Sequence, residues 1–352
     1  MLNSYQVETV EPVSAGGERM RNILAVSQSI LSLEKHREQF ELTLNQADVI
    51  MVTVDLDGVV FKHPDYDQEG RIIDESTESW TNPMITDELK ILGASLQLLK
   101  TKCTEKGKRL IVALNTNREI GIAKKVFDGL PDDIAGHCLC SLEAGHVKAF
   151  LDKSGNMVAQ SLPDSDAELS TLKKAVGHDF ETAFSDGLFG KLAYKPFRQG
   201  MITYRNVDPE IVGWDEEAKT VSGPLLTILE KHGYPHNHHF KVVYYPFDGG
   251  LDIQFTKFSK QTGEVDLIDI ATDLGLVASN DKVIQVHFGD TWSDALNGTG
   301  QTTKGIWYDV FTLAVANSQQ RLLDHAKATT QSGGRWGIYE GIRLLEDMLT
   351  QT

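Results

Sequence analysis

This 352-residue chain has few cysteines, no long apolar run and no leader-like sequence in its first residues. Each of these features argues against a class of protein. There are only three cysteines, too few for a disulfide framework, and the Cys138-Leu-Cys140 pair has no second pair to complete a zinc site. No apolar run approaches the length that spans a membrane, and the first residues lack the basic and apolar regions of a secretory signal. We therefore expect Cys103, Cys138 and Cys140 to be reduced thiols in a cytoplasmic protein.

Positive charge is also in short supply. The chain has 34 Lys and Arg residues against 50 Asp and Glu residues, a formal net charge of -16. A phosphate backbone or an anionic lipid surface is bound by clustered Lys and Arg, so we expect neither a nucleic-acid nor a membrane partner. With 41% hydrophobic and 24% charged residues, the composition is typical of a globular protein, and the length is sufficient for two domains.

The strongest pattern that is present is Val49-Ile-Met-Val-Thr-Val-Asp55-Leu-Asp57-Gly58. An apolar, β-branched run that stops at two acids predicts a strand buried on both faces, with Asp55 and Asp57 at its carboxyl end. Period-two alternation would project both carboxylates to the same side of the sheet. Two such acids repel each other, and Mg²⁺ is the natural partner for their oxygens. The alternative is a strand end where both acids cap a turn or the next helix.

Two further predicted strands also end in polar residues. The first, 109–115, stops at Thr116-Asn117-Arg118, and the second, 282–288, at Gly289-Asp290 with Asp294 shortly after. Open α/β sheets carry their chemistry at this edge. A hydroxyl and backbone amides before a helix form a cradle for an oxyanion, and the later acids supply further metal ligands. In each case the alternative is an N-cap residue that starts the next helix.

The remaining patterns organise the chain around these strands. Amphipathic helices are expected within 18–47, at 86–106 with Thr86 as N-cap, and from Lys260 to Leu274. Shorter alternating runs at 147–151, 192–195, 200–205 and 240–245, with helices near 166–176 and 223–232, predict an inserted α+β module. The polar segment 63–83 is read either as a flap or as a solvated insertion. The imidazole-rich loop 235–239 is read as a solvent loop in preference to a metal site.

Taken in order, these motifs resemble a known family. The Asp55-x-Asp57-Gly strand, Thr116-Asn-Arg118, a Lys after an inserted module, and Gly289-Asp290-x-x-x-Asp294 resemble the four motifs of the haloacid dehalogenase superfamily of phosphohydrolases. The position of the insertion is similar to that of the branch with a C2-type cap, which includes Cof-type sugar phosphatases, sucrose-phosphatase relatives and phosphomannomutases. The resemblance covers roughly residues 49 to 345. Asn117 stands where many members have Gly.

The resemblance implies a fold and a division into domains. The expected fold is α/β: a Rossmann-like three-layer α/β/α core with a mainly parallel sheet, plus an α+β cap. The expected boundaries are a helical N-terminal extension at 1–47, a core at 48–145 and 251–352, and a cap at 146–250.

It also implies roles for the site residues. Asp55 would be the nucleophile and Asp57 the acid and base, while Thr116, Asn117 and Lys260 would hold the phosphoryl group. Mg²⁺ would be held by Asp55, Asp57 and Asp290, with Asp294 supporting either the metal or Lys260. The candidates for substrate contacts in the cap are Lys195, Arg198 and Arg205, each equally open to a structural ion-paired role.

Three functions follow as hypotheses. The first is a Mg²⁺-dependent phosphatase that acts on a small phosphorylated metabolite, with a sugar phosphate as the favoured substrate, through an aspartyl-phosphate intermediate. The second is a phosphomutase of the phosphomannomutase type, and the third is a non-catalytic binding or regulatory protein on the same fold. A homo-oligomer is left open.

Overall fold

The computed structural model describes most of the chain. The described residues are 36–61, 83–136, 138–152, 154–161, 163–185, 192–195, 198–206, 214–235, 238–245, 250–296, 298–315, 320–331 and 334–351. The segment read as a flap or insertion (apart from Pro83), the helices predicted before residue 36, and His236 and Asn237 of the imidazole-rich loop lie outside them. Those predictions stay predictions.

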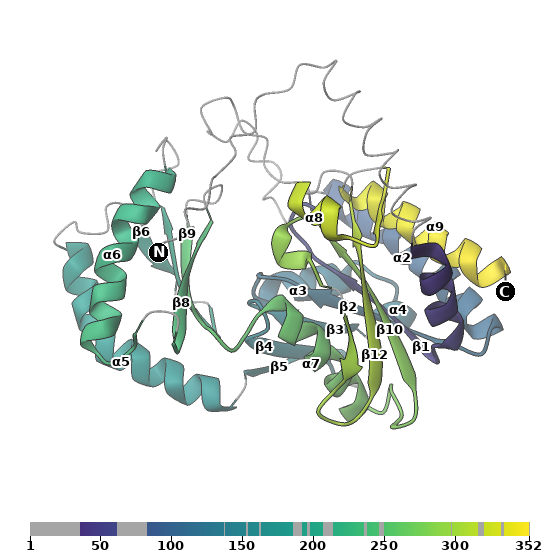
Figure 1. The fold of residues 1–352 in the computed structure, drawn as a ribbon, viewed down its shortest axis with the longest axis horizontal. Coiled ribbons are helices and arrows are strands. Elements are labelled where there is room, and N and C mark those ends of the chain that lie inside the picture. Colours follow the sequence, from purple (N-terminus) through teal and green to yellow (C-terminus); the bar gives the residue numbers. More distant parts are fainter. Residues whose placement is uncertain are drawn as a thin grey trace, which may run out of the picture.

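A nine-stranded, mostly parallel sheet forms the centre of the larger domain, the core domain, in the order β11-β12-β10-β1-β2-β3-β4-β5, with β13 paired to β12 (Figure 1). Its strands are β1 Val49–Val54, β2 Arg109–Asn115, β3 Cys138–Leu142, β4 Val147–Leu151, β5 Met157–Ser161, β10 Lys282–Gly289, β11 Gly298–Gln301, β12 Trp307–Ala314 and β13 Ala328–Thr329. Every residue of β1 is buried, which confirms the strand predicted from its unbroken apolar run.

Helices cover both faces of this sheet. Alternate residues of β1 explain the layers, because Ile50 and Val52 pack in one apolar cluster while Val49 and Met51 pack in another. The first cluster includes residues of α2 Pro83–Glu105, α3 Ile120–Asp128, α4 Asp132–Ala135 and α9 Gly334–Gln351, and the second includes residues of α7 Lys260–Asp273. The predicted three-layer α/β fold is thus confirmed. The remaining short helices are η2 Trp292–Asp294 and α8 Gln320–His325.

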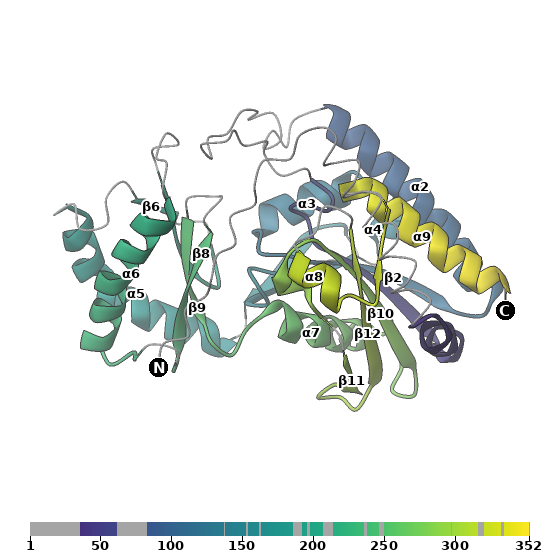
Figure 2. The same cartoon turned by 45° about the horizontal axis from the view of Figure 1, so that its top comes forward.

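A second sheet belongs to the inserted module, here called the cap domain (residues 163–255). Its order is β6-β7-β9-β8, and Figure 2 shows it set apart from the core sheet. Its strands are β6 Leu192–Lys195, β7 Ile202–Asn206, β8 Phe240–Tyr245 and β9 Gly250–Phe255, and its helices are α5 Pro163–Ser185 and α6 Trp214–Lys231. The helices and one face of the sheet share their own apolar cluster, as expected of a separate domain.

The structure differs from the predicted domain boundaries at both ends of the cap. β4 and β5 were assigned to the cap, but they extend the core sheet, since β4 pairs antiparallel with β3. β9 was assigned to the core, but it pairs with β7 and β8 in the cap sheet. Period-two alternation identifies a strand without identifying its partner, so the pattern could not assign these three strands to their sheets.

The helices also differ from the prediction in three respects. α2 begins at Pro83, so Thr86 lies inside the helix and is not its N-cap. Proline is favoured in a first turn because the backbone N–H that it lacks would have no intrahelical partner there. The four-residue helix α4 was not predicted. The helical residues 36–46 belong to the core, since Phe40 and Leu44 are buried and the Phe40 ring lies 4.9 Å from that of Phe311.

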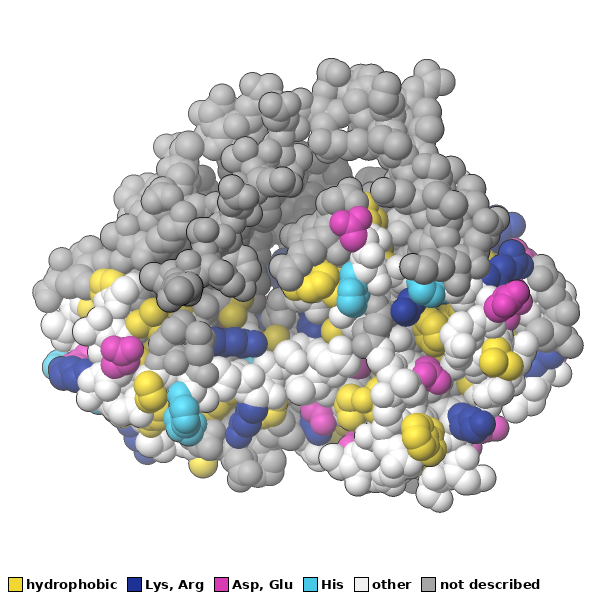
Figure 3. Space-filling model, in the orientation of Figure 1, with side chains coloured by type: hydrophobic (Ala, Val, Ile, Leu, Met, Phe, Trp, Pro, Cys, Tyr) yellow, Lys and Arg dark blue, Asp and Glu magenta, His cyan; other side chains and the backbone are white. Residues whose placement is uncertain are grey.

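Two observations bear on the predicted partners. Among the described residues, no helix combines the length and apolar character needed to cross a bilayer. On the face drawn in Figure 3, the Lys and Arg side chains of the described residues are scattered and do not gather into one patch. The cytoplasmic location and the oligomeric state stay predictions.

Candidate active site

The site is built at the carboxyl ends of three adjacent parallel strands. Val54 of β1 is in register with Phe288 of β10 and with Leu114 of β2. The residues that follow these strands, among them Asp55, Thr116 and Asp290, therefore come to the same edge of the sheet. The sequence predicted this edge from the polar residues that end each apolar run.

Three carboxylates meet at this edge. Asp55, Asp290 and Asp294 each place one oxygen within 4.8 Å of the others, and all three side chains are buried. The close approach of Asp294 depends on Gly289, because a Cβ at that position would lie 2.1 Å from the Cβ of Asp294. A dense set of buried carboxylate oxygens is the donor set that Mg²⁺ prefers, so these residues fit a divalent cation.

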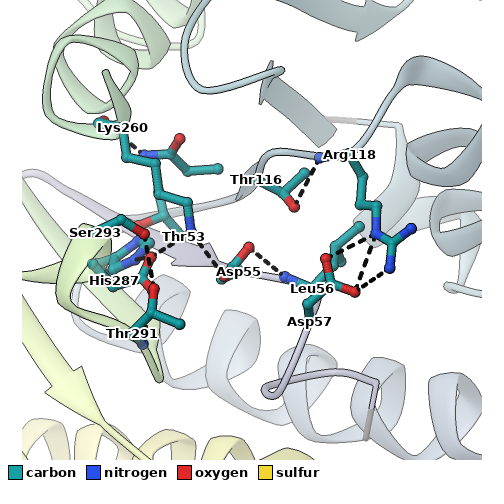
Figure 4. A network of polar contacts seen from close by, with 12 residues as sticks. Thr53, Asp55, Leu56, Asp57, Thr116, Arg118, Lys260, His287, Thr291 and Ser293 are labelled. Carbon is teal, nitrogen blue, oxygen red and sulfur yellow. Dashed lines mark hydrogen bonds and ion pairs between the residues drawn. The ribbon is translucent and has the colours of Figure 1, made fainter. Parts of the chain in front are cut away.

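The Lys260 ammonium points toward Asp55 (Figure 4). Its Nζ is 2.7 Å from Asp55 Oδ2 and 2.6 Å from Asp294 Oδ1. Lys260 is the first residue of α7, whose N-terminus is fixed by a capping box between Ser259 and Thr262. The sequence predicted a helix that begins at Lys260, and the helix brings the ammonium to the acid cluster.

Burial and neighbouring charges shift the ionisation of this group. Burial raises the pKa of Asp55 to about 7, the Lys260 ammonium opposes the rise, and the carboxylates of Asp294, Asp57 and Asp290 add to it. For Lys260, burial would lower the pKa, but Asp294 and Asp55 outweigh it and hold the pKa above its usual value. The ammonium thus stays charged, and a further cation would favour the ionised Asp55.

Asp57 occupies a different environment from Asp55. β1 ends at Val54, and the contacts of Asp57 differ from those of Asp55; the projection of both carboxylates to the same side of the sheet stays a prediction. Arg118 contacts both oxygens of Asp57, with Nε 2.8 Å from Oδ2 and Nη2 2.7 Å from Oδ1. In Figure 4 this ion pair lies across from Lys260, with Thr116 between them. Thr116 is fully buried, and its Oγ1 accepts the Arg118 backbone N–H at 3.3 Å.

Three buried polar residues that the sequence did not single out extend the site inward. His287 of β10 places Nε2 3.0 Å from Asp294 Oδ1 and Nδ1 2.8 Å from Glu264 Oε1. The amide of Asn115 donates to the same Glu264 oxygen at 2.8 Å. Burial alone would lower the pKa of His287, but Glu264 and Asp294 raise it to about 9. For His287 and Asn115 the signal was a polar residue in an otherwise apolar strand, whereas Glu264 lies on α7 and had no such signal.

The cap contributes Arg198 to the boundary between the domains. Its side chain is 5% exposed, and Nη1 lies 3.8 Å from Glu119 Oε2 and donates to the backbone oxygen of Asn117. This side chain therefore ties the cap to the loop that carries Thr116. Lys195 and Arg205 lie on the paired strands β6 and β7, and their substrate roles stay predictions.

Two more contacts join the domains beside the site. The buried carboxylate of Glu143 accepts the backbone N–H groups of Gln199, at 3.0 Å, and Gly200, at 2.8 Å. The ring of His146 accepts the Phe255 N–H on Nε2 at 3.1 Å. The short turn that carries Glu143 and His146 is therefore the core side of the domain boundary.

No family model matches the chain, and neither does any curated protein sequence. Solved structures do match over nearly their whole length. A trehalose-6-phosphate phosphatase domain from C. albicans is 14% identical, with a TM-score of 0.49, over 88% of this chain and 96% of its own. The sucrose-phosphatase from Synechocystis is 14% identical, with a TM-score of 0.42, over 85% of this chain and 98% of its own.

A haloacid dehalogenase-like hydrolase from Bacillus subtilis is also 14% identical, with a TM-score of 0.38, over 85% of this chain and 95% of its own. A shared fold does not by itself identify an activity, which depends on the site residues. The solved structures similar to this chain thus include two sugar-phosphate phosphatases and a hydrolase of the superfamily whose motifs the sequence resembles.

Proposed function

We propose that this protein is a Mg²⁺-dependent phosphatase that releases phosphate from a small phosphorylated metabolite, with sugar phosphates as the substrate class. The observation that carries the proposal is the position of Lys260, whose Nζ lies 2.7 Å from Asp55 Oδ2 and 2.6 Å from Asp294 Oδ1. A nucleophile beside a fixed cation is what phosphoryl transfer requires, because catalysis of this reaction is mainly positioning and charge neutralisation.

The proposed reaction has two displacements. In the first, an Asp55 oxygen attacks phosphorus, the bond from phosphorus to the ester oxygen breaks, and Asp57 gives its proton to the leaving oxygen. In the second, Asp57 takes a proton from water, and the water oxygen attacks the aspartyl phosphate to release inorganic phosphate and free Asp55. Thr116, Asn117 and Lys260 would contact the phosphoryl oxygens.

The chain's own residues determine where a cation would bind. Asp55, Asp290 and Asp294 offer oxygens within 4.8 Å of one another, and the resemblance adds the backbone oxygen of Asp57. Bound there, Mg²⁺ would neutralise charge on the transferring group. Asp294 binds Lys260 through Oδ1 and Thr291 through Oδ2, which matches the supporting role that the resemblance allows for it. We therefore assign Asp294 to the support of Lys260 and Asp290 to the metal.

Replacement of the nucleophile tests the proposal. We expect Asp55→Asn to lower phosphate release from p-nitrophenyl phosphate by roughly 10³-fold or more, because the amide cannot form the covalent intermediate. Asp48→Asn is the matched control, since Asp48 precedes the same strand at its opposite end and its carboxylate accepts the Lys282 N–H. Normal turnover by Asp55→Asn would exclude the mechanism.

Removal of divalent cations tests the metal assignment. We expect EDTA to abolish phosphate release and added Mg²⁺ to restore it. Among the described residues, the buried carboxylates of Asp55, Glu264, Asp290 and Asp294 lie at the site together with the buried cationic side chains of Lys260 and His287, and a divalent cation would offset the excess negative charge. Phosphate release that is unaffected by EDTA would exclude the metal. A panel of sugar phosphates, assayed with and without a sugar bisphosphate, would identify the substrate and separate a phosphatase from a phosphomutase.

A further inference from the structure

Behind the acid cluster, the interior between the sheet and α7 is polar where the same layer is otherwise apolar. Glu264 and His287 are both fully buried. Further along this layer, Met51, Leu267 and Ile268 pack in an apolar cluster. A buried ion pair usually adds little stability compared with well-packed apolar side chains, so a pair at this position calls for a role other than stability.

The contacts of His287 define that role. Each of its ring nitrogens faces a carboxylate oxygen, with Nε2 3.0 Å from Asp294 Oδ1 and Nδ1 2.8 Å from Glu264 Oε1. Only a cationic imidazole has an N–H donor on both nitrogens. His287 therefore bridges two acids that would otherwise repel each other, and Thr53 Oγ1 lies 3.0 Å from the same Nδ1.

Asp294 connects this pair to the reacting groups. Its Oδ1 contacts both His287 Nε2 and Lys260 Nζ, and its Oδ2 accepts the N–H and O–H of Thr291 at 3.1 and 2.8 Å. Four contacts from His287, Lys260 and Thr291 therefore hold the Asp294 carboxylate. Lys260 Nζ in turn lies between Asp294 and Asp55. Glu264 lies one helical turn after Lys260, and Asn115 Nδ2 bonds both the Glu264 carboxylate and the Lys260 backbone oxygen.

From these contacts we infer that Glu264 and His287 are positioning residues, which hold Asp294 and thereby keep the Lys260 ammonium against Asp55. The inference rests on the proposed phosphatase function for its kinetic consequence. Neither residue touches the reacting atoms, and their effect is transmitted through one carboxylate. Such positioning matters because a displacement of about 1 Å at a reacting group can cost roughly 100-fold in rate.

A double apolar replacement separates positioning from a structural role. Either single replacement would leave an uncompensated buried charge and endanger the fold. Glu264→Met combined with His287→Leu removes both charges and fills the space of the two side chains with apolar groups of similar size. We expect the double variant to fold, with a thermal transition as cooperative as that of the wild type. Its kcat for p-nitrophenyl phosphate should fall by roughly 100-fold, with KM within about threefold.

Gln285→Leu is the matched control. Gln285 is fully buried on the same strand two residues before His287, and its amide bonds the backbone oxygen of Glu264 at 2.8 Å. This variant removes a buried polar group from the same layer without touching Asp294, so its kcat should stay near that of the wild type. A folded double variant with unchanged kcat, or an equal loss of kcat in Gln285→Leu, would overturn the inference.

A crystal structure of the double variant tests the inference without an assay. We expect the Lys260 Nζ to Asp55 Oδ2 distance to lengthen from 2.7 Å beyond hydrogen-bond range, and an unchanged distance would contradict the positioning role. A wild-type enzyme that releases no phosphate from any substrate would count against the proposed function alone, and the distance would still decide the role of the pair.

Discussion

His146 shows how a single buried side chain can make stability depend on pH. Its Nε2 accepts the Phe255 N–H at 3.1 Å, and its Nδ1 contacts the Glu143 backbone oxygen. A ring that accepts on one nitrogen and donates on the other is neutral. Burial, which outweighs the hydrogen bond to Glu143, lowers the pKa of His146 to about 4.

We expect the free energy of unfolding to fall as the pH is lowered from about 6.5 to about 4. In this range the unfolded chain binds a proton at His146 that the folded protein does not bind. The free energy of unfolding therefore falls by about 3 kcal/mol over the range. Urea unfolding of the wild type and of His146→Gln, followed between pH 7 and 4, measures this effect. The variant should be less stable at pH 7 and recover most of its deficit at pH 4; parallel curves would show that His146 does not titrate in this way.

At the residue scale, the sequence was informative where strand geometry alone decides position. Asp55, Thr116 and Asp290 could be brought together in advance because parallel strands share one carboxyl edge. The ion pair of Asp57 with Arg118 was not predicted, because the two residues lie 61 positions apart in the chain. The contacts of His287 could not be predicted, since its partners come from a helix and a turn that only the folded chain brings to it.

The turn between β3 and β4 is the most strained element of the described backbone. Glu143, Ala144 and Gly145 have φ values of 50°, 55° and 88°, all in the left-handed region that disfavours residues with a Cβ. A Cβ at Gly145 would also lie 2.6 Å from the Ser259 backbone oxygen. Strain of this kind persists only where the surrounding structure holds it, and here the turn carries the core side of the domain boundary.

We expect Gly145→Ala to destabilise the protein by about 3 kcal/mol or more, because it adds a backbone clash to the cost of a left-handed φ. Gly155→Ala is the matched control. Gly155 has a φ of 77° in the β4–β5 turn, and no atom of the described residues lies within 4 Å of a Cβ added there. Its replacement should cost only about 1 kcal/mol. If denaturant unfolding showed equal losses of unfolding free energy for the two variants, the backbone at Ser259 would have to shift to accommodate the added Cβ.

At the element scale, long apolar strands were predicted most reliably because both faces are buried and the run is unbroken. Short or polar elements were missed or cut short. α4 has four residues, too few to show a helical period, and α5 extends from Pro163 to Ser185, well past the predicted helix at 166–176. A solvated helix face carries little apolar signal, so its ends cannot be read from periodicity.

For the whole molecule, the sequence predicted an inserted module but not its contacts with the core. The change to shorter alternating runs indicated an insertion, whereas the assignment of β4, β5 and β9 depended on which strands they pair with, and alternation does not specify a partner. The contacts of Glu143 with Gln199 and Gly200 had no sequence signal, because a carboxylate that binds backbone N–H groups does not depend on the identity of its partners.

We expect Glu143→Ala to loosen the boundary between the domains. Hydrogen bonds from backbone amides to a charged acceptor are among the stronger ones, so hydrogen exchange at the amides of Gln199 and Gly200 should accelerate by roughly tenfold or more. Exchange along β10 should not change. Glu119→Ala serves as the control, since Glu119 lies 3.8 Å from Arg198 Nη1 but does not bind those amides; unchanged exchange in Glu143→Ala would contradict the assignment of this contact.

The path of the chain between the domains limits how far they can part. Only residue 162 lies between β5 and α5, and only 256–259 lie between β9 and α7. An extended chain covers at most roughly 3.5 Å per residue, so neither connection has much slack. A rotation of the cap that stretches these connections to their full length must either rotate α7 or break the capping box of Ser259. The short connection 256–259 therefore links the position of the cap to that of the Lys260 ammonium beside Asp55. Through this connection, the chain couples access to the site with the placement of its lysine.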